Sequence, residues 1–137
     1  MSVTRYLVDT NVPLRFLSGE PAGQAAAARR LFERASRGEA VLDVAPIIVA
    51  EAFYTLTSFY QVERKTAARK LSLLLQQHGV RPRDASATFS ALQHLQTANV
   101  GFADAFLASL AREENLPVAS FDRDFDKLGA PRYEPGE

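Results

Sequence analysis

Three carboxylates in this sequence stand far from any other charged side chain. Asp9 is the only charged residue in YLVDTNVPL, Glu51 the only one in PIIVAEAFYTLTSFY, and Asp104 the only one between residues 85 and 111. A helical carboxylate that serves solubility usually has a basic residue three or four positions away, and neither Glu51 nor Asp104 has one. Carboxylates on apolar faces are normally protonated, paired or bound to metal, so these three are candidates for chemistry.

A fourth candidate, Asp122, lies in SFDRDFDKLG, where three acids and two bases would ordinarily form a solvated turn. Its interest comes from following an apolar run, LPVASF, as Asp9 follows YLV. Plain structural roles also exist for the isolated acids. Asp9 would cap the helix after it, Asp104 would interact with a helix dipole, and Glu51 would pair with an arginine of another helix. We favour a shared site because four such explanations are needed at once.

Strands and helices alternate along the chain. The expected strands cover residues 4–8 (a buried strand), 41–45, 80–82, 116–121 and about 132–134. The expected helices cover residues 11–17, 25–35, 46–60, about 63–78, 86–97 and 102–114. This order predicts a single α/β domain over residues 1–137, a three-layer α/β/α sandwich with a short central parallel sheet. Sites in such folds lie at the carboxyl ends of the strands, where Asp9 and Asp122 would meet.

Four carboxylates in one cleft need a counter-charge. Two unit charges about 4 Å apart repel by ~4 kcal/mol at an effective dielectric of about 20. The chain has no cysteine, and oxygen ligands without nearby histidine favour Mg²⁺ or Mn²⁺ over zinc. Such ions bind phosphates, orient water and lower its pKa, so the expected chemistry is metal-dependent phosphodiester hydrolysis.

The sequence resembles the PIN-domain ribonucleases, and most closely the VapC-type toxins of bacterial toxin–antitoxin pairs. The resemblance rests on YLVDTNVPLRFL, IIVAEAFYTL, VGFADAFLASLA and LPVASFDRDFDKL, in this order and spacing over nearly the whole chain. It implies a PIN-like fold and an endoribonuclease that depends on Mg²⁺ or Mn²⁺. It also implies homodimers and a small antitoxin protein whose tail blocks the acidic cleft.

The same resemblance implies residue roles. Asp9, Glu51, Asp104 and Asp122 stand at the four acidic positions of the family. Asp9 and Asp104 would be the principal metal ligands. Glu51 and Asp122 would act directly or through water, and the sequence does not choose which of them positions the attacking water.

Three further residues match supporting positions. Asn11 would orient the first acid, and Ser120 keeps a hydroxyl where threonine is common. Asp124 matches a more variable acid and has a structural role as its alternative. Asn11 also argues against a phosphotransferase of the haloacid-dehalogenase kind, which needs a second aspartate at that place. A receiver-like phosphoacceptor fits poorly, because Lys127 is badly placed for the lysine that it requires.

Composition limits the possible partners. The 16 basic and 16 acidic side chains give zero net charge, which argues against a protein that coats nucleic acid in general. RNA would be held by basic residues at 29, 30, 34 and 37 or at 64, 65, 69 and 70, although a solvated helix face explains each run equally well. We expect a cytoplasmic protein without a membrane partner, since MSVTRYLVDTN lacks a signal peptide's apolar region. The alternative function is a catalytically silent PIN-like module that binds protein or RNA.

Overall fold

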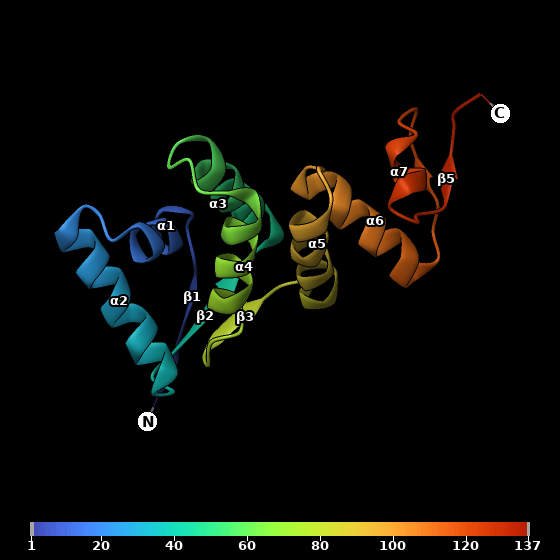
Figure 1. The fold of residues 1–137 in the computed structure, drawn as a ribbon. Helices are drawn as coiled ribbons and strands as arrows, with labels where there is room; N and C mark the ends of the chain where they lie inside the picture. The colour runs from blue at the N-terminus through green and yellow to red at the C-terminus, as the bar shows by residue number, and fades with distance from the viewer. Residues whose placement is uncertain (1, 137) are drawn as a thin grey trace.

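The computed structural model of the chain describes residues 2–136, and its helices and strands alternate along the chain (Figure 1). The strands are β1 (Thr4–Leu7), β2 (Ala40–Val44), β3 (Val80–Pro82), β4 (Val118–Ala119) and β5 (Arg132–Tyr133). The helices are α1 (Asn11–Ser18), α2 (Ala22–Ser36), α3 (Pro46–Ser58), α4 (Arg64–Leu75), α5 (Ala85–Thr97), α6 (Phe102–Glu114) and α7 (Asp124–Lys127). The expected order of elements is confirmed, with α7 as an addition inside the segment read as a turn.

The strands pair in parallel throughout, but they form two sheets. β2 lies between β1 and β3 in a three-stranded sheet, and β4 pairs with β5 alone. The predicted α/β class, a three-layer α/β/α fold with a parallel sheet, is confirmed. The prediction had a single sheet, however, and the structure divides it between β1 and β4.

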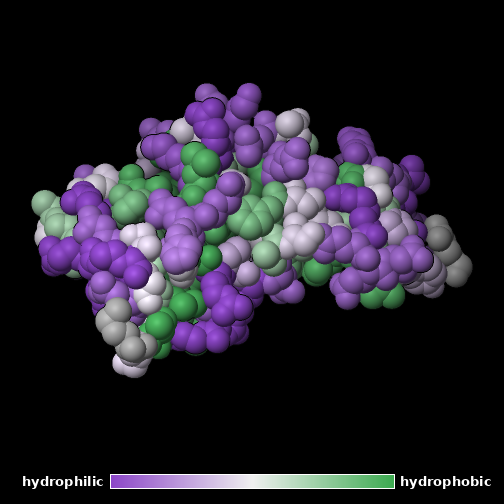
Figure 2. Space-filling model, turned by 90° about the horizontal axis from the view of Figure 1, so that it is seen from below, coloured by the Kyte–Doolittle hydropathy of each residue, from purple (hydrophilic) through white to green (hydrophobic). Residues whose placement is uncertain are grey.

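Helix α6 joins two packed regions. The N-terminal body (residues 2–101) has the larger core, to which α6 adds Phe102 and Ala105 from its first turns. The C-terminal unit (residues 115–136) has a small core of its own, which α6 completes with Ala108 and Ala111. The molecule is elongated, and its termini lie at opposite ends (Figure 1). The space-filling view from below shows the same long outline, with apolar atoms reaching the surface of the N-terminal body (Figure 2).

Local chemistry explains where several elements begin and end. Pro46 occupies the first turn of α3, where its missing amide costs no helical hydrogen bond. Gly79 has φ +86°, and a Cβ there would lie 2.5 Å from the carbonyl oxygen of Ala35. Only glycine therefore fits between α2 and the start of β3.

Two expectations about the strands are wrong. β1 was expected to be buried, but each of its residues is exposed, because no strand among the described residues 2–136 pairs with its outer edge. The strand expected over residues 116–121 shrinks to Val118–Ala119, since within residues 2–136 only the two-residue strand β5 lies alongside it. None of the helices within residues 2–136 has both the length and the apolar character needed to cross a membrane.

Candidate functional site

The first half of the candidate site lies at the carboxyl end of β1. Asp9 follows the strand, and its Oδ1 accepts a hydrogen bond of 2.8 Å from the backbone amide of Thr10. The hydroxyl of Thr10 donates to Oε2 of Glu51 on α3 over 2.7 Å. One threonine thus links the two acids, although they are 42 positions apart in the sequence.

These contacts decide between the alternative roles of the two acids. An N-cap aspartate accepts from an amide two or three residues later, whereas Asp9 accepts from the next residue and α1 has no side-chain cap. Glu51 is exposed and forms no ion pair with any residue that the structure describes. Capping and pairing with a distant arginine therefore do not account for Asp9 and Glu51.

The second half of the site joins the start of α6 to the segment after β4. Burial raises the pKa of the Asp104 carboxyl above its usual range, and the charges of Asp122 and Asp124 raise it further. Asp122 is fixed by two local bonds: its amide donates to the Ser120 hydroxyl over 2.9 Å, and its Oδ1 accepts from the Asp124 amide over 2.9 Å. Asp122 and Asp124 are therefore close enough to Asp104 for their charges to act on its carboxyl.

The structure does not unite the two halves within one chain. Among residues 2–136, no three histidine, cysteine, aspartate or glutamate side chains lie close enough together to hold a metal ion. The reason is the divided sheet: Asp9 follows β1 and Asp122 follows β4, which belong to different sheets. The expectation that four acids meet at one edge of one sheet therefore fails within a single copy.

The supporting residues differ in how far the structure involves them. Ser120 holds the Asp122 turn, and Asp124 contributes its amide to that turn and its carboxylate to an exposed ion pair with Lys127 at 3.6 Å. Asn11 is exposed and makes no hydrogen bond to Asp9 within the described chain. Thr10, through its backbone amide, orients Asp9, the role that was expected of Asn11. Thr10 was not among the residues predicted from the sequence, although it directly follows the first acid.

A buried carboxylate that the sequence did not single out is Asp43 of β2, which is 6% exposed. Its Oδ2 accepts from Arg5 of β1 at 2.8 Å and from Arg83 after β3 at 3.3 Å, while Oδ1 has no partner within residues 2–136. The hydrogen bond from Arg5 holds the pKa of Asp43 below its usual range, against the opposing effect of burial. Asp43 thus ties together the three strands of the larger sheet, and a lone charge inside AVLDV was the available signal.

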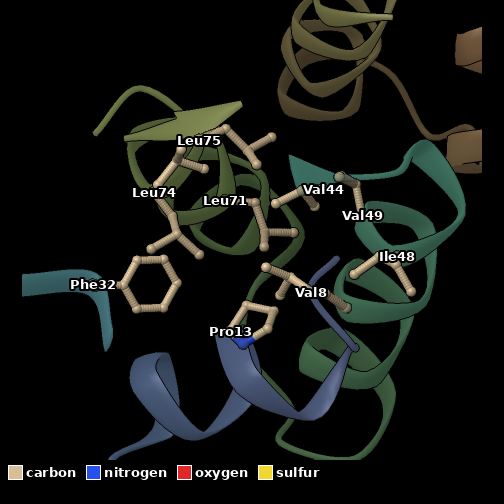
Figure 3. A pocket seen from close by; sticks show the side chains of 11 residues that line it. Val8, Pro13, Phe32, Val44, Ile48, Val49, Leu71, Leu74 and Leu75 are labelled. Atoms are coloured by element: carbon tan, nitrogen blue, oxygen red, sulfur yellow. The ribbon is translucent and has the colours of Figure 1, made fainter. Parts of the chain in front are cut away.

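The molecule has two hollows of different character, an apolar cavity in the core and an open hollow beside Glu51. The cavity in Figure 3 has a volume of about 10 Å³ and lies in the core of the N-terminal body, lined only by apolar residues. It is barely the size of one water and offers no polar partner, so it is a packing gap. An open hollow between α3 and the start of α6 is different, because Glu51, Tyr54 and Arg64 line it beside Phe102.

Comparison with known proteins identifies the family. The PIN domain family model matches residues 6–131, so the chain belongs to the PIN-domain family. No curated protein and no solved structure matches the chain. Membership defines a nuclease-type fold, and PIN domains are generally nucleases, which supports a hydrolase in the broad sense.

Proposed function

We propose that this protein is a Mg²⁺- or Mn²⁺-dependent endoribonuclease that hydrolyses RNA phosphodiester bonds. The observation that carries the proposal is a set of carboxylates without cationic partners, held in two ordered groups on a PIN fold. None of Asp9, Glu51 and Asp104 forms an ion pair within residues 2–136, and neither does Asp122. Carboxylates kept unpaired and crowded are a costly arrangement that a cation would relieve.

Carboxylate oxygens are the type of ligand that a hard divalent cation prefers. Within one chain, however, the carboxylates are held as two separate groups. Oδ2 of Asp9, Oε1 of Glu51 and Oδ2 of Asp122 accept no hydrogen bond from the described residues and remain free to coordinate. A bound Mg²⁺ or Mn²⁺ would supply charge neutralisation and Lewis acidity towards a phosphate. A complete set of ligands needs both halves of the site.

The chain's own residues orient these carboxylates before a substrate arrives. Thr10 fixes Asp9 through its amide and Glu51 through its hydroxyl. Ser120 and the Asp124 amide fix Asp122. Groups held in place by such bonds need little rearrangement when charge develops on a phosphate, which lowers the barrier to hydrolysis.

An RNA path is proposed along the hollow between α3 and α6. Glu51 lies on its wall, and Tyr54 is 71% exposed there, free to stack on a base.

Because the site is acidic, the backbone of RNA would be held by exposed basic residues elsewhere. These are Arg29 and Arg30 on α2 and Lys65, Arg69 and Lys70 on α4. Arg64 is excluded from that group, since it is half-buried and donates to the carbonyl groups of Ala98 and Val100.

The biological role that we propose is the toxin of a type II toxin–antitoxin pair of the VapC kind, acting in the cytoplasm as a single PIN domain. The proposal extends the resemblance of the four sequence segments to the toxin branch of the family. It expects a small antitoxin encoded beside this gene, whose tail occupies the acidic groups. Growth arrest on expression, relieved by co-expression of the neighbouring small protein, is the expected result. Expression without any effect on growth contradicts the toxin role and leaves the nuclease proposal standing.

The enzyme proposal is tested with a mixed RNA pool and Mg²⁺ or Mn²⁺. Wild type should cleave only with metal, and Asp9→Asn and Asp104→Asn should each lower the rate by roughly 100-fold or more. Glu20→Gln is the matched control, because Glu20 is an exposed acid whose carboxylate makes no contact in the described chain. Cleavage that survives both aspartate substitutions would sink the site assignment. Wild type without cleavage and without metal binding by calorimetry would favour a silent binding module.

A further inference from the structure

β1 is an edge strand of the three-stranded sheet, and its outer edge is free within the described residues. The amides of Thr4 and Val8 donate to the carbonyl groups of residues 39 and 43 on the β2 side. Strand residues alternate in direction, so Arg5 and Leu7 point their backbone groups to the other edge, where no strand lies within the described chain. Leu7 is also 73% exposed. An edge strand with unpaired amide and carbonyl groups is a template for pairing with a further strand.

β4 has the complementary free edge. The amides of Val118 in β4 and of Ser120 directly after it donate to the carbonyl groups of residues 131 and 133, on the β5 side. Ala119 therefore points its backbone groups away from β5, where the described residues supply no strand. The flanking residues Leu116 and Phe121 are 58% and 74% exposed. A second parallel edge with apolar flanks is thus available in the same molecule.

The two edges of one chain are held apart by α5 and α6. Side chains clamp α6 along α5: Ser109 donates to Ser90 over 2.9 Å, and Ser86 donates to Glu113 over 2.5 Å. A guanidinium nitrogen of Arg112 also lies 2.8 Å from a ring nitrogen of His94. Only residues 115–117 connect α6 to β4, a span of at most about 11 Å. In Figure 1, α5 and α6 accordingly lie between β1 and the C-terminal unit.

We propose that β4 of a second copy pairs in parallel with β1, and that the same pairing occurs reciprocally in a two-fold dimer. Each sheet would then run β3-β2-β1 from one copy and β4-β5 from the other, a continuous five-stranded parallel sheet. A two-fold axis makes both contacts identical, so no free β1 or β4 edge remains. The occupant is a second copy because only that occupant brings a parallel β4 to β1 without breaking the clamp between α5 and α6.

The exchange also completes the acid site, a consequence that rests on the proposed function. Asp9 lies two residues beyond the end of β1, and Asp122 lies three residues beyond the end of β4. Pairing the strands in parallel brings both carboxylates to the same edge of the sheet. Asp9 and Glu51 of one copy would face Asp122 and Asp104 of the other, giving two four-acid sites per dimer.

Cross-linking tests the pairing without relying on activity. The chain has no cysteine, so Leu7→Cys and Ala119→Cys each introduce a single thiol. A short bis-maleimide, spanning about two strand separations of ~5 Å, should link the mixed single variants into a species of twice 15.1 kDa on a denaturing gel. Leu73→Cys replaces Leu7→Cys as the control and should give no link, because Leu73 is 58% exposed but belongs to helix α4 and to neither strand edge. A double variant that links only within one chain, or no link in any sample, would overturn the exchange.

A proline tests the same edge by hydrogen bonding. Ala119→Pro removes the one amide of β4 that points away from β5, while the bonds from Val118 and Ser120 to β5 stay. The dissociation constant of the dimer, measured by light scattering over a dilution series, should rise about tenfold or more. Ala119→Gly keeps the amide and should leave the dimer intact. A monomeric wild type, or an unchanged dimer in Ala119→Pro, contradicts the proposal.

Mixing inactive variants tests the composite site. Co-expressed Asp9→Asn and Asp122→Asn should regain about a quarter of wild-type cleavage, because half of the dimers are mixed and each mixed dimer has one intact site of two. Asp9→Asn with Glu51→Gln should regain nothing, since both changes fall in the same half. Cross-links and active wild type without regained cleavage would overturn the composite site. Wild type that forms the dimer but never cleaves RNA would sink the proposed function and leave the pairing in place.

Discussion

The N-terminal body and the C-terminal unit differ in the size of their cores and in the number of strands that pair. The body packs a three-stranded sheet among five helices and ties its strands together through the buried Asp43. Within the described residues the unit has two short strands and one short helix. Its core has five buried residues, of which three are alanines and two come from α6. Each region nevertheless holds part of the acidic site. The contrast teaches that the less supported region gains most from a partner, because its strands have the least to pair with.

The largest expected difference between the two regions is in the unfolding free energy lost when a buried core side chain is truncated. Leu71→Ala in the body removes a side chain that is 2% exposed and should cost about 4 kcal/mol of unfolding free energy. Leu128→Ala in the unit should cost about 2 kcal/mol, since its surroundings are thinner and collapse more easily. Urea denaturation followed by circular dichroism measures both. Equal losses would mean that the two regions share one equally packed core.

Breaking an ion pair should lower the melting temperature more in the N-terminal body than in the C-terminal unit. Asp43→Asn breaks the link between β1, β2 and the segment after β3. It should lower the melting temperature more than Asp126→Asn, because the Asp43 side chain is 8% exposed, whereas that of Asp126, in its pair with Arg132, is 56% exposed. Because Asp43 has a lowered pKa in the folded chain, its contribution is present above the ordinary aspartate pKa of about 3.9. It is lost as the pH falls through the still lower folded value. Melting temperatures of wild type and Asp43→Asn should therefore converge in strong acid, and a constant gap at all pH values would contradict this role.

The hollow beside Glu51 predicts a smaller effect on RNA binding. Tyr54→Ala should weaken binding of a single-stranded RNA about fivefold or more, by loss of roughly 1 kcal/mol of stacking. Phe59→Ala is the control, because Phe59 directly follows α3 and is 74% exposed but does not line the hollow. Fluorescence anisotropy with catalytically silent Asp9→Asn protein as background measures binding alone. Equal effects of the two substitutions would remove the hollow from the RNA path.

The smallest expected effect is a gain in stability from losing a functional charge. The pKa of Asp104 is raised in the folded chain, so its ionised form destabilises the fold at neutral pH. Asp104→Asn should raise the melting temperature slightly at pH 7, and the gain should disappear as the pH falls through the ordinary aspartate value, where wild type is protonated as well. Asp124→Asn should gain less, since Asp124 pairs with Lys127. A loss of stability in Asp104→Asn would mean that this carboxylate supports the fold.

The sequence predicted well what local patterns determine. β2 and α3 follow directly from AVLDV and from Pro46, because burial and a proline at a helix start are encoded within a few residues. It predicted neither the exposure of β1 nor the gap between β1 and β4, since strand neighbours distant in the chain depend on how α5 and α6 pack. Thr10 escaped notice because a single hydroxyl has no pattern. The acids were chosen individually from the sequence, and their distribution between two regions required the structure.

Mn²⁺ binding by mixed variants tests the central claim most directly: one metal site is made from two carboxylates of each of two copies. Calorimetric titration should find tight sites in wild type and none in Asp9→Asn or Asp122→Asn alone. Co-expressed as a mixture, the two variants should recover about a quarter of the wild-type sites, because only mixed dimers join an intact Asp9 half to an intact Asp122 half. A mixture that binds no more Mn²⁺ than either variant alone, beside a wild type that binds it, would contradict the account.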